Sequence, residues 1–218
     1  QWDMTCTDTR NSLYKILYGL RAAVEEVALQ NNSTENVLFG KAEHSSTPST
    51  NILGITVHSG DLLVSRGGAE VSAFISRGND YPGNFSHVAL VYIDEASNTP
   101  YLIEAHIEKG VAVSSVADYV KDKKLRFMVL RPRFDLQQMK TDSMLPQKVA
   151  HYAFKEAAKR HIPYDFKMNY DDSSAMFCSE VGSYAYRKNG LQLWKAVSTI
   201  SSPGVENWLK SFGVEHFV

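Results

Sequence analysis

The segment spanning residues 60–132 constrains the fold more than any other part of the chain, because short apolar runs alternate in it with turn residues. Turns such as residues 94–100 and Lys109-Gly110 are short, so the runs that they join are expected to pair in antiparallel fashion. The segment therefore predicts a central antiparallel sheet or a small barrel. The expected strands are residues 62–64, 88–93, 101–107, 111–113 and 126–130.

Helices are expected on both sides of this segment. Apolar residues recur every three or four positions over residues 10–31, which predicts an amphipathic helix, and Pro146 suits the first turn of a second helix. Ser173 or Ser174 can cap a third helix that runs to about Lys188. The fold class is therefore α+β, with helices flanking the sheet.

The remaining segments fit one domain over residues 1–218. A last short helix is expected from Pro203 onward. Residues 32–51 are rich in Asn, Ser and Thr and show little periodicity, so they are expected to form a connector. The 218 residues are 44% hydrophobic, which is enough to bury the core of a single domain.

The charge composition argues against two classes of partner. Lys and Arg number 23 and Asp and Glu number 24, which leaves a formal net charge of −1. Nucleic acids and anionic membranes attract a concentrated basic field, so neither is an expected partner. No apolar run reaches the length of a membrane span.

The first residue is Gln1 rather than Met. Either the sequence has been cut from a longer one, or a targeting segment has already been removed. The second alternative predicts an exported protein of the periplasm or cell envelope.

Cys6 and Cys178 are the two cysteines, and in an oxidising compartment they could form one disulfide. Cys6 lies in a polar segment and Cys178 in an apolar, helix-like run, so two free thiols are expected. If the helix begins near Ser174, the Cys178 thiol lies about one turn inside it, where the helix dipole favours a thiolate. The local sequence leaves a buried structural cysteine equally open.

A nucleophilic thiol requires a base and a group that orients that base. His87 precedes an apolar strand, where a rigid element would hold its ring within reach, although an ordinary strand-end histidine has the same pattern. Glu104 lies in the middle of the next apolar strand, where a carboxylate needs a partner if it is buried. It could fix the tautomer of His87, or it could simply face solvent.

A metal site is the competing interpretation of the same strand. Glu104, His106 and Glu108 alternate, so they would share one face of an extended strand and could offer ligands to a divalent ion. Three residues along one strand span too far to close around a single ion. No His or Cys pair with zinc spacing supports the site, so no metal and no cofactor is expected.

Several short motifs follow one another in a set order, and together they are more specific than any one of them. They are Gly60-Asp61-Leu62-Leu63, Phe85-Ser86-His87-Val88-Ala89, Leu102-Ile103-Glu104-Ala105, Pro163-Tyr164-Asp165 and Phe177-Cys178-Ser179-Glu180. This set resembles the permuted papain-like amidases of the YebB/YiiX type, which are relatives of the NlpC-type cell-wall peptidases. In an unpermuted papain-like enzyme the cysteine precedes the histidine, whereas here His87 comes first.

The resemblance implies a circularly permuted papain-like fold of the NlpC type. It also implies that Cys178 is the nucleophile, His87 the base and Glu104 the acid that orients the base. Tyr164 is implied to lie close to the site, as a donor to the oxyanion or to the substrate. Asp165 is implied to hold the loop before the nucleophile helix.

Two segments lie outside the family pattern. The helix over residues 10–31 and the connector 32–51 are an addition, which is expected to cover or shape the cleft. The segment 65–83 is long for a loop, and its Arg66 and Arg77 either recognise a substrate carboxylate or are merely solvated.

The function implied by the relatives is hydrolysis of an amide in a short peptide or N-acyl amide, with cell-wall peptides favoured. The reaction would pass through an acyl-enzyme and would need no cofactor. One alternative keeps the same residues but acts on lipid acyl groups, which would require an apolar channel or a membrane anchor. Another alternative is a binding module that no longer turns over.

Overall fold

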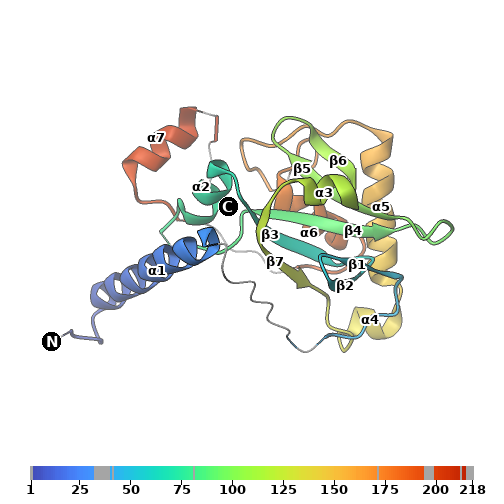
Figure 1. Cartoon of the computed structure of the whole chain (residues 1–218), viewed down its shortest axis with the longest axis horizontal. Coiled ribbons are helices and arrows are strands. Elements are labelled where there is room, and N and C mark those ends of the chain that lie inside the picture. The colour runs from blue at the N-terminus through green and yellow to red at the C-terminus, as the bar shows by residue number, and fades with distance from the viewer. Residues whose placement is uncertain are drawn as a thin grey trace.

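The computed structural model describes residues 2–31, 40, 42–80, 82–170, 172–193, 199–211 and 213–214. Over these residues the chain is a mixed α+β structure built on a five-stranded antiparallel sheet (Figure 1). The strands are β3 (Leu62–Gly67), β4 (His87–Ile93), β5 (Pro100–His106), β6 (Gly110–Ser115) and β7 (Lys124–Leu130). Their order is β6-β5-β4-β3-β7 with β6 and β7 at the edges, so the sheet is open and the barrel alternative is wrong.

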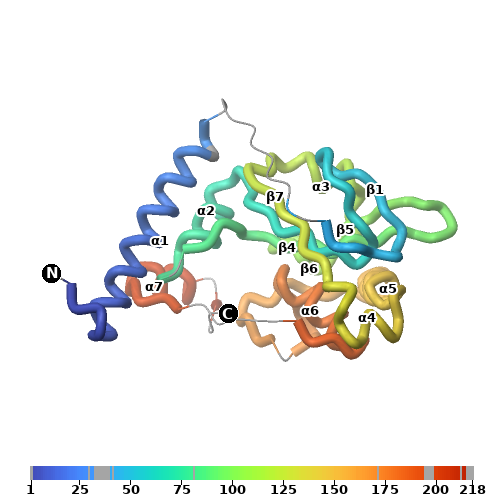
Figure 2. The backbone as a smooth tube through the Cα atoms, turned by 90° about the horizontal axis from the view of Figure 1, so that it is seen from below, coloured from blue at the N-terminus to red at the C-terminus, as the bar shows by residue number. Residues whose placement is uncertain are grey.

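One face of the sheet is covered by helices, as Figure 2 shows from below. These helices are α4 (Gln137–Thr141), α5 (Leu145–Lys159) and α6 (Cys178–Lys188). Leu90 and Ile103 of the sheet pack there with Val149 of α5 and Val181 of α6, all of them buried. A Cβ on Gly182 would lie 2.4 Å from the Leu62 side chain, so glycine at this position allows α6 to approach the sheet closely.

The opposite face is covered by a hairpin and a short helix. The hairpin consists of β1 (Ser49–Ile52) and β2 (Ile55–His58), and the helix is α3 (Val116–Lys121). Ile52, Val57 and Tyr119 from these elements pack on Leu63 and Leu102 of the sheet. The expectation of a plain connector over residues 32–51 is therefore wrong at its end, where β1 begins, while residues 32–39 and 41 lie outside the described residues.

Two further helices lie side by side beyond one end of the sheet. They are α2 (Glu70–Arg77) and α7 (Pro203–Ser211), and the rings of Phe74 and Trp208 meet between them with centroids 4.2 Å apart. Helix α7 begins at Pro203, as expected from the sequence. Helix α2 corrects the expectation of a long loop over residues 65–83.

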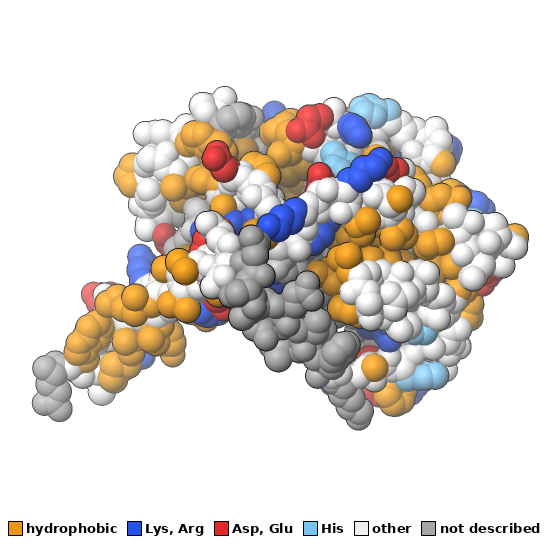
Figure 3. Space-filling view, viewed as in Figure 1, with side chains coloured by type: hydrophobic (Ala, Val, Ile, Leu, Met, Phe, Trp, Pro, Cys, Tyr) orange, Lys and Arg blue, Asp and Glu red, His pale blue; other side chains and the backbone are white. Residues whose placement is uncertain are grey.

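The N-terminal helix α1 (Thr7–Gln30) leans away from the sheet and agrees with the helix expected over residues 10–31. Its apolar side chains gather on an uncovered surface (Figure 3), and Leu17, Leu20 and Val24 are all more than half exposed. Among the described helices, none has the length and apolar character required to cross a membrane.

A cluster of arginines ties the C-terminal part of α1 to the body of the protein. The Arg66 guanidinium is buried and donates from Nη2 to both carboxylate oxygens of Glu26, at 2.9 and 3.1 Å. Arg77 lies 3.7 Å from Glu26, and Arg126 donates to Glu25 at 3.0 Å. Both readings of Arg66 and Arg77 are therefore wrong, since each guanidinium is paired with α1 rather than solvated or open to a substrate.

Candidate active site

Cys178 is the first residue of α6 rather than a residue one turn inside it. The expected start near Ser173 or Ser174 is wrong, because the backbone before Cys178 is held in another conformation. Met176 donates its N–H to the carbonyl of Pro163 at 3.0 Å, and its own carbonyl accepts from Asp165 at 3.2 Å. These two bonds prevent the helix from starting earlier.

The helix start is completed by Glu180 in the first turn. Its carboxylate accepts the N–H of Phe177, the residue before the helix, at 3.0 Å. Asp165 is buried and accepts from the N–H groups of Lys167 and Asn169 at 2.8 and 2.6 Å, so it fixes the loop before α6. The helix therefore presents the Cys178 thiol at its positive end, where a thiolate is stabilised.

The thiol of Cys178 is free, as is that of Cys6. Burial raises the pKa of Cys178, but a hydrogen bond with His87, the charge of that imidazole and the backbone N–H groups of Val88 and Ser179 lower it below its ordinary value. The site therefore makes the thiolate easier to form than at an ordinary cysteine.

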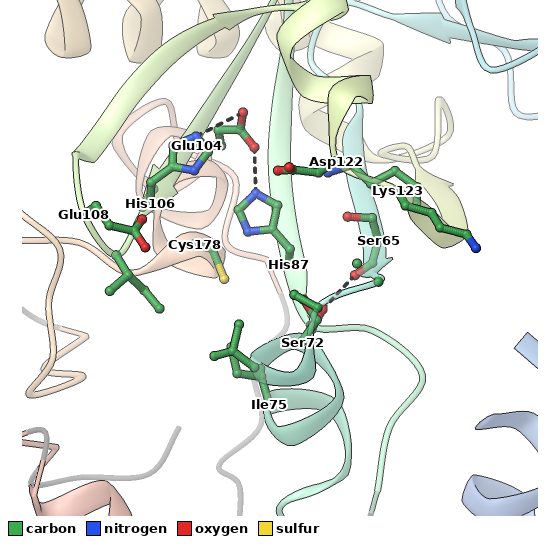
Figure 4. A pocket seen from close by; sticks show the side chains of 18 of the residues that line it. Ser65, Ser72, Ile75, His87, Glu104, His106, Glu108, Asp122, Lys123 and Cys178 are labelled. Atoms are coloured by element: carbon green, nitrogen blue, oxygen red, sulfur yellow. Dashed lines mark hydrogen bonds and ion pairs between the residues drawn. The ribbon is translucent and has the colours of Figure 1, made fainter. Parts of the chain in front are cut away.

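His87 opens β4, and its imidazole lies between the thiol and a carboxylate (Figure 4). The ring nitrogen Nε2 lies 2.7 Å from Oε2 of Glu104, so the other nitrogen, Nδ1, is the one that faces Cys178. Burial lowers the pKa of His87, but its bonds to Cys178 and Glu104 outweigh this and raise that pKa to about 9. Together with the lowered pKa of the thiol, this favours a thiolate–imidazolium pair.

Glu104 lies on β5 next to β4, where it pairs in register with Ala89. The side chain is buried, which excludes the solvent-facing alternative, and its two oxygens contact two imidazoles. Oε2 contacts His87, and Oε1 lies 3.3 Å from Nε2 of His106. Burial raises the pKa of Glu104, but the bonds from His106 and His87 lower it well below its usual range, so the carboxylate stays ionised.

These contacts also bear on the metal alternative. Both oxygens of Glu104 are engaged by histidines, and Glu108 lies beyond the end of β5. Within the described part of the chain, no three His, Cys, Asp or Glu side chains come together in positions that could hold one metal ion. The arrangement is thus a hydrogen-bonded His–Glu–His chain rather than an open ligand set.

The thiol opens into a cavity of about 430 Å³ that is lined by β3, α2, the end of β5 and the segment before α6. His87, Glu104, Tyr164 and Cys178 all line it. Burial and the neighbouring charge of Cys178 raise the pKa of Tyr164 above its ordinary value, so its hydroxyl remains a donor. The four residues singled out from the sequence are therefore brought to one cavity.

Two features of the site were not assigned from the sequence. One is the second imidazole of His106 on Glu104, which had been considered for a metal; the alternation of residues 104 and 106 on one strand was its signal. The other is the pair of backbone N–H groups of Val88 and Ser179 at the sulfur, which only the three-dimensional fold brings together.

Comparison with known protein families matches residues 56–205 to the permuted papain-like amidase enzymes of the YaeF/YiiX type, the C92 family. Among solved structures, the chain is similar to one described as the metalloprotein yiiX from Escherichia coli O157:H7, with 22% identity and a TM-score of 0.56. That similarity covers 73% of this chain and 87% of the other. No curated protein matches the sequence. The family match spans most of the chain and includes the sheet and the helices that cover one face of it. The chain therefore belongs to the permuted papain-like amidases.

Proposed function

We propose that the chain is a cysteine hydrolase that cleaves an amide bond in a short peptide or an N-acyl amide through an acyl-enzyme. Cys178 is the nucleophile, His87 the base and Glu104 the residue that orients His87. The observation that carries the proposal is the position of the His87 ring, which contacts Glu104 through Nε2 at 2.7 Å and faces the Cys178 thiol with Nδ1.

The first half of the reaction forms the acyl-enzyme. The Cys178 sulfur bonds to the carbonyl carbon, and the negative charge moves to the carbonyl oxygen. Backbone N–H groups at the start of α6 and the Tyr164 hydroxyl stabilise that charge. When the C–N bond breaks, the His87 imidazolium gives its proton to the departing amine.

The second half releases the acid. Water attacks the thioester and gives a proton to His87, after which the thiolate leaves and the carboxylic acid departs. Glu104 remains ionised throughout and stabilises the imidazolium. The cycle returns the thiolate–imidazolium pair.

The proposal is tested by the pH dependence of alkylation. In a Cys6→Ser background, iodoacetamide should label Cys178 at pH 6, well below the ordinary thiol pKa of about 8.5, with intact-protein mass as the measurement. His87→Ala should move the labelling curve to higher pH, because the imidazolium that stabilises the thiolate is gone. Identical curves for the two proteins would contradict the assignment of His87.

A further inference from the structure

Helix α1 has two faces of opposite character, and its polar face is the one turned toward the rest of the protein. Ala22 is buried there, and Glu25 and Glu26 are held by Arg126 and Arg66. The apolar side chains form the uncovered surface visible in Figure 3. This is the reverse of a helix that packs on its own domain, whose apolar stripe faces the core.

The apolar side chains of this surface recur with the spacing of a coiled-coil seam. Steps of four and three residues alternate along the helix, and the residues that follow them, here called the α1 seam, are Leu13, Leu17, Leu20, Val24 and Val27. A repeat of 3.5 residues is the pattern by which two helices interlock along their length. In the same repeat, Ala22, Glu25 and Glu26 occupy the three positions opposite the seam. The spacing therefore predicts another helix as the partner of this surface.

Most of the seam is exposed to water. Leu17 is 52% exposed, Leu20 60%, Val24 68% and Val27 72%. Figure 1 shows the N-terminal half of α1 projecting beyond the body of the protein. Most of the stability of a helix in a protein comes from the packing of its apolar face, so a partner on the seam would stabilise this half.

The side chains that flank the seam suit a second copy of the same helix. They carry a single charge, that of Arg21, because the other flanking residues are Tyr14, Ile16, Ala23, Ala28 and Gln30. The Arg21 guanidinium already donates to the carbonyl of Pro82 at 2.8 Å. Two copies can therefore meet along the seam with little repulsion between like charges.

The distribution of charge along α1 favours antiparallel pairing. Asp8 apart, the acidic residues are Glu25 and Glu26 near the C-terminal end, and the basic residues all precede them: Arg10, Lys15 and Arg21. An antiparallel partner places the basic part of each helix beside the acidic part of the other, and it also opposes the two helix dipoles.

A lipid surface fits these charges less well. Helices that lie in a membrane interface are rich in Lys and Arg on their polar face. In α1, three basic side chains are balanced by three acidic ones, and the polar face is engaged by the arginine cluster.

We propose that the α1 seam pairs with the same seam of a second copy, so that the protein forms a symmetric antiparallel dimer. A two-fold axis across the helices covers both seams at once and closes the assembly. With 24 residues, α1 offers a contact about 36 Å long. The residues that line the thiol cavity lie outside α1, so the pairing is independent of the proposed function.

Sedimentation equilibrium of the full chain measures the association. At about 100 µM the mass should approach twice the 24.4 kDa of one chain. Leu20→Glu should weaken the dimer by at least roughly 100-fold, because a symmetric dimer buries this leucine twice and each copy contributes about tenfold or more. Val24→Glu repeats the test at a second seam position, and circular dichroism checks that both variants are folded.

Gly19→Glu is the matched control. It introduces the same charge one residue away from Leu20, at a position where a side chain would meet open space. The mass of this variant should equal that of the wild-type protein.

The natural thiol of Cys6, next to the start of α1, reports the direction of pairing. In Cys178→Ala it is the sole thiol of the chain, so a spin label can be attached there alone. Antiparallel helices should hold the two labels at least about 30 Å apart, whereas parallel helices would bring them within about 20 Å. Dipolar electron spin resonance measures this separation, and the shorter one would overturn the antiparallel arrangement.

Three other outcomes would overturn the pairing. One is a wild-type protein that stays monomeric at this concentration. Another is a dimer that both seam variants retain, because its interface would lie elsewhere. The third is a monomer that binds phosphatidylcholine vesicles and loses this binding in Leu20→Glu, which would assign the seam to a lipid surface.

Discussion

At the scale of single residues, the protein concentrates four ionisable side chains at one end of the sheet. Glu104 is fixed between the imidazoles of His87 and His106, and His87 in turn lies beside Cys178. Each group changes the protonation of the next, so their contributions to catalysis are expected to be interdependent rather than additive.

Substitutions of Cys178, His87 and Glu104 should reduce activity in a definite order. Cys178→Ala should reduce kcat/KM by on the order of 10⁴-fold or more, and His87→Ala should be almost as severe. Glu104→Gln should cost roughly 10²-fold, because the amide oxygen can still accept from the imidazole but stabilises the cation poorly. Steady-state kinetics on a hydrolysed substrate measure the order, with circular dichroism as the control for folding. Near-full activity of His87→Ala would mean that another base, with His106 first in line, performs the reaction.

The pH dependence of kcat/KM should report the ionisation of Cys178 and of His87. In the proposed mechanism the active form carries a thiolate and an imidazolium, so kcat/KM should rise as Cys178 ionises and fall above pH about 9 as His87 loses its proton. Glu104→Gln should move the alkaline limb to lower pH, since a neutral partner no longer supports the imidazolium. An alkaline limb that does not move would contradict the role assigned to Glu104.

At the scale of secondary-structure elements, the sequence predicted the strands and helix ends that depend on local residue patterns. The strand that contains Glu104 and the one that begins at His87 were visible as apolar runs joined by a short turn, and they do pair. Pro203 and Asn189-Gly190 mark helix ends by their own backbone preferences, and the structure agrees.

Features that depend on contacts between distant segments, such as the start of α6, could not be predicted from the sequence. Helix α6 starts at Cys178 because Met176 is bonded to Pro163 and Asp165, a tertiary interaction with no local signal. Helix α2 was missed because the glycines around it suggested a loop. Without that helix, one wall of the thiol cavity could not be foreseen, and neither could the pairing of Arg66 with α1.

The first turn of α6 should make stability depend on pH. Burial and the nearby charges of Asp165 and Asp172 raise the pKa of Glu180 to about 7, although the Phe177 N–H lowers it. The folded state therefore holds a proton that the unfolded chain releases near pH 4.5, so stability should fall as pH rises from about 4.5 to 7. The loss amounts to about 3 kcal/mol.

Glu180→Gln isolates this contribution, because glutamine can accept the same N–H without titrating. Urea unfolding at pH 5 and pH 7.5 should show the wild-type protein losing stability relative to the variant across that interval. If the two proteins changed in stability by the same amount between pH 5 and pH 7.5, Glu180 would titrate normally and the prediction would be wrong.

At the scale of the whole molecule, the arginine cluster joins α1 to the wall of the site. Arg77 is the last residue of α2, and it lies near the same Glu26 that pairs with the buried Arg66. Removing Glu26 would leave the Arg66 guanidinium buried without its carboxylate. Loss of one partner of a buried ion pair is costly, whereas replacing both partners is tolerated.

A two-step substitution tests that account. Glu26→Gln should lower the free energy of unfolding by about 2 kcal/mol, and adding Arg66→Met should recover much of the loss. Thermal and urea unfolding measure both, with Glu25→Gln as a control whose partner Arg126 is more exposed than Arg66. A double variant less stable than Glu26→Gln would contradict the account.

The packing of α6 on β4 has a consequence for the order in which the protein becomes active. Synthesis proceeds from the N-terminus, so the ribosome releases His87 and Glu104 long before Cys178. A nascent chain that ends before α6 holds His87 and Glu104 but lacks Cys178, the thiol that the proposed mechanism acylates. On that mechanism, the first turnover awaits the emergence of α6 and its docking on a sheet whose strands were already made. On the proposed mechanism, the protein is thus inert until α6 has been made.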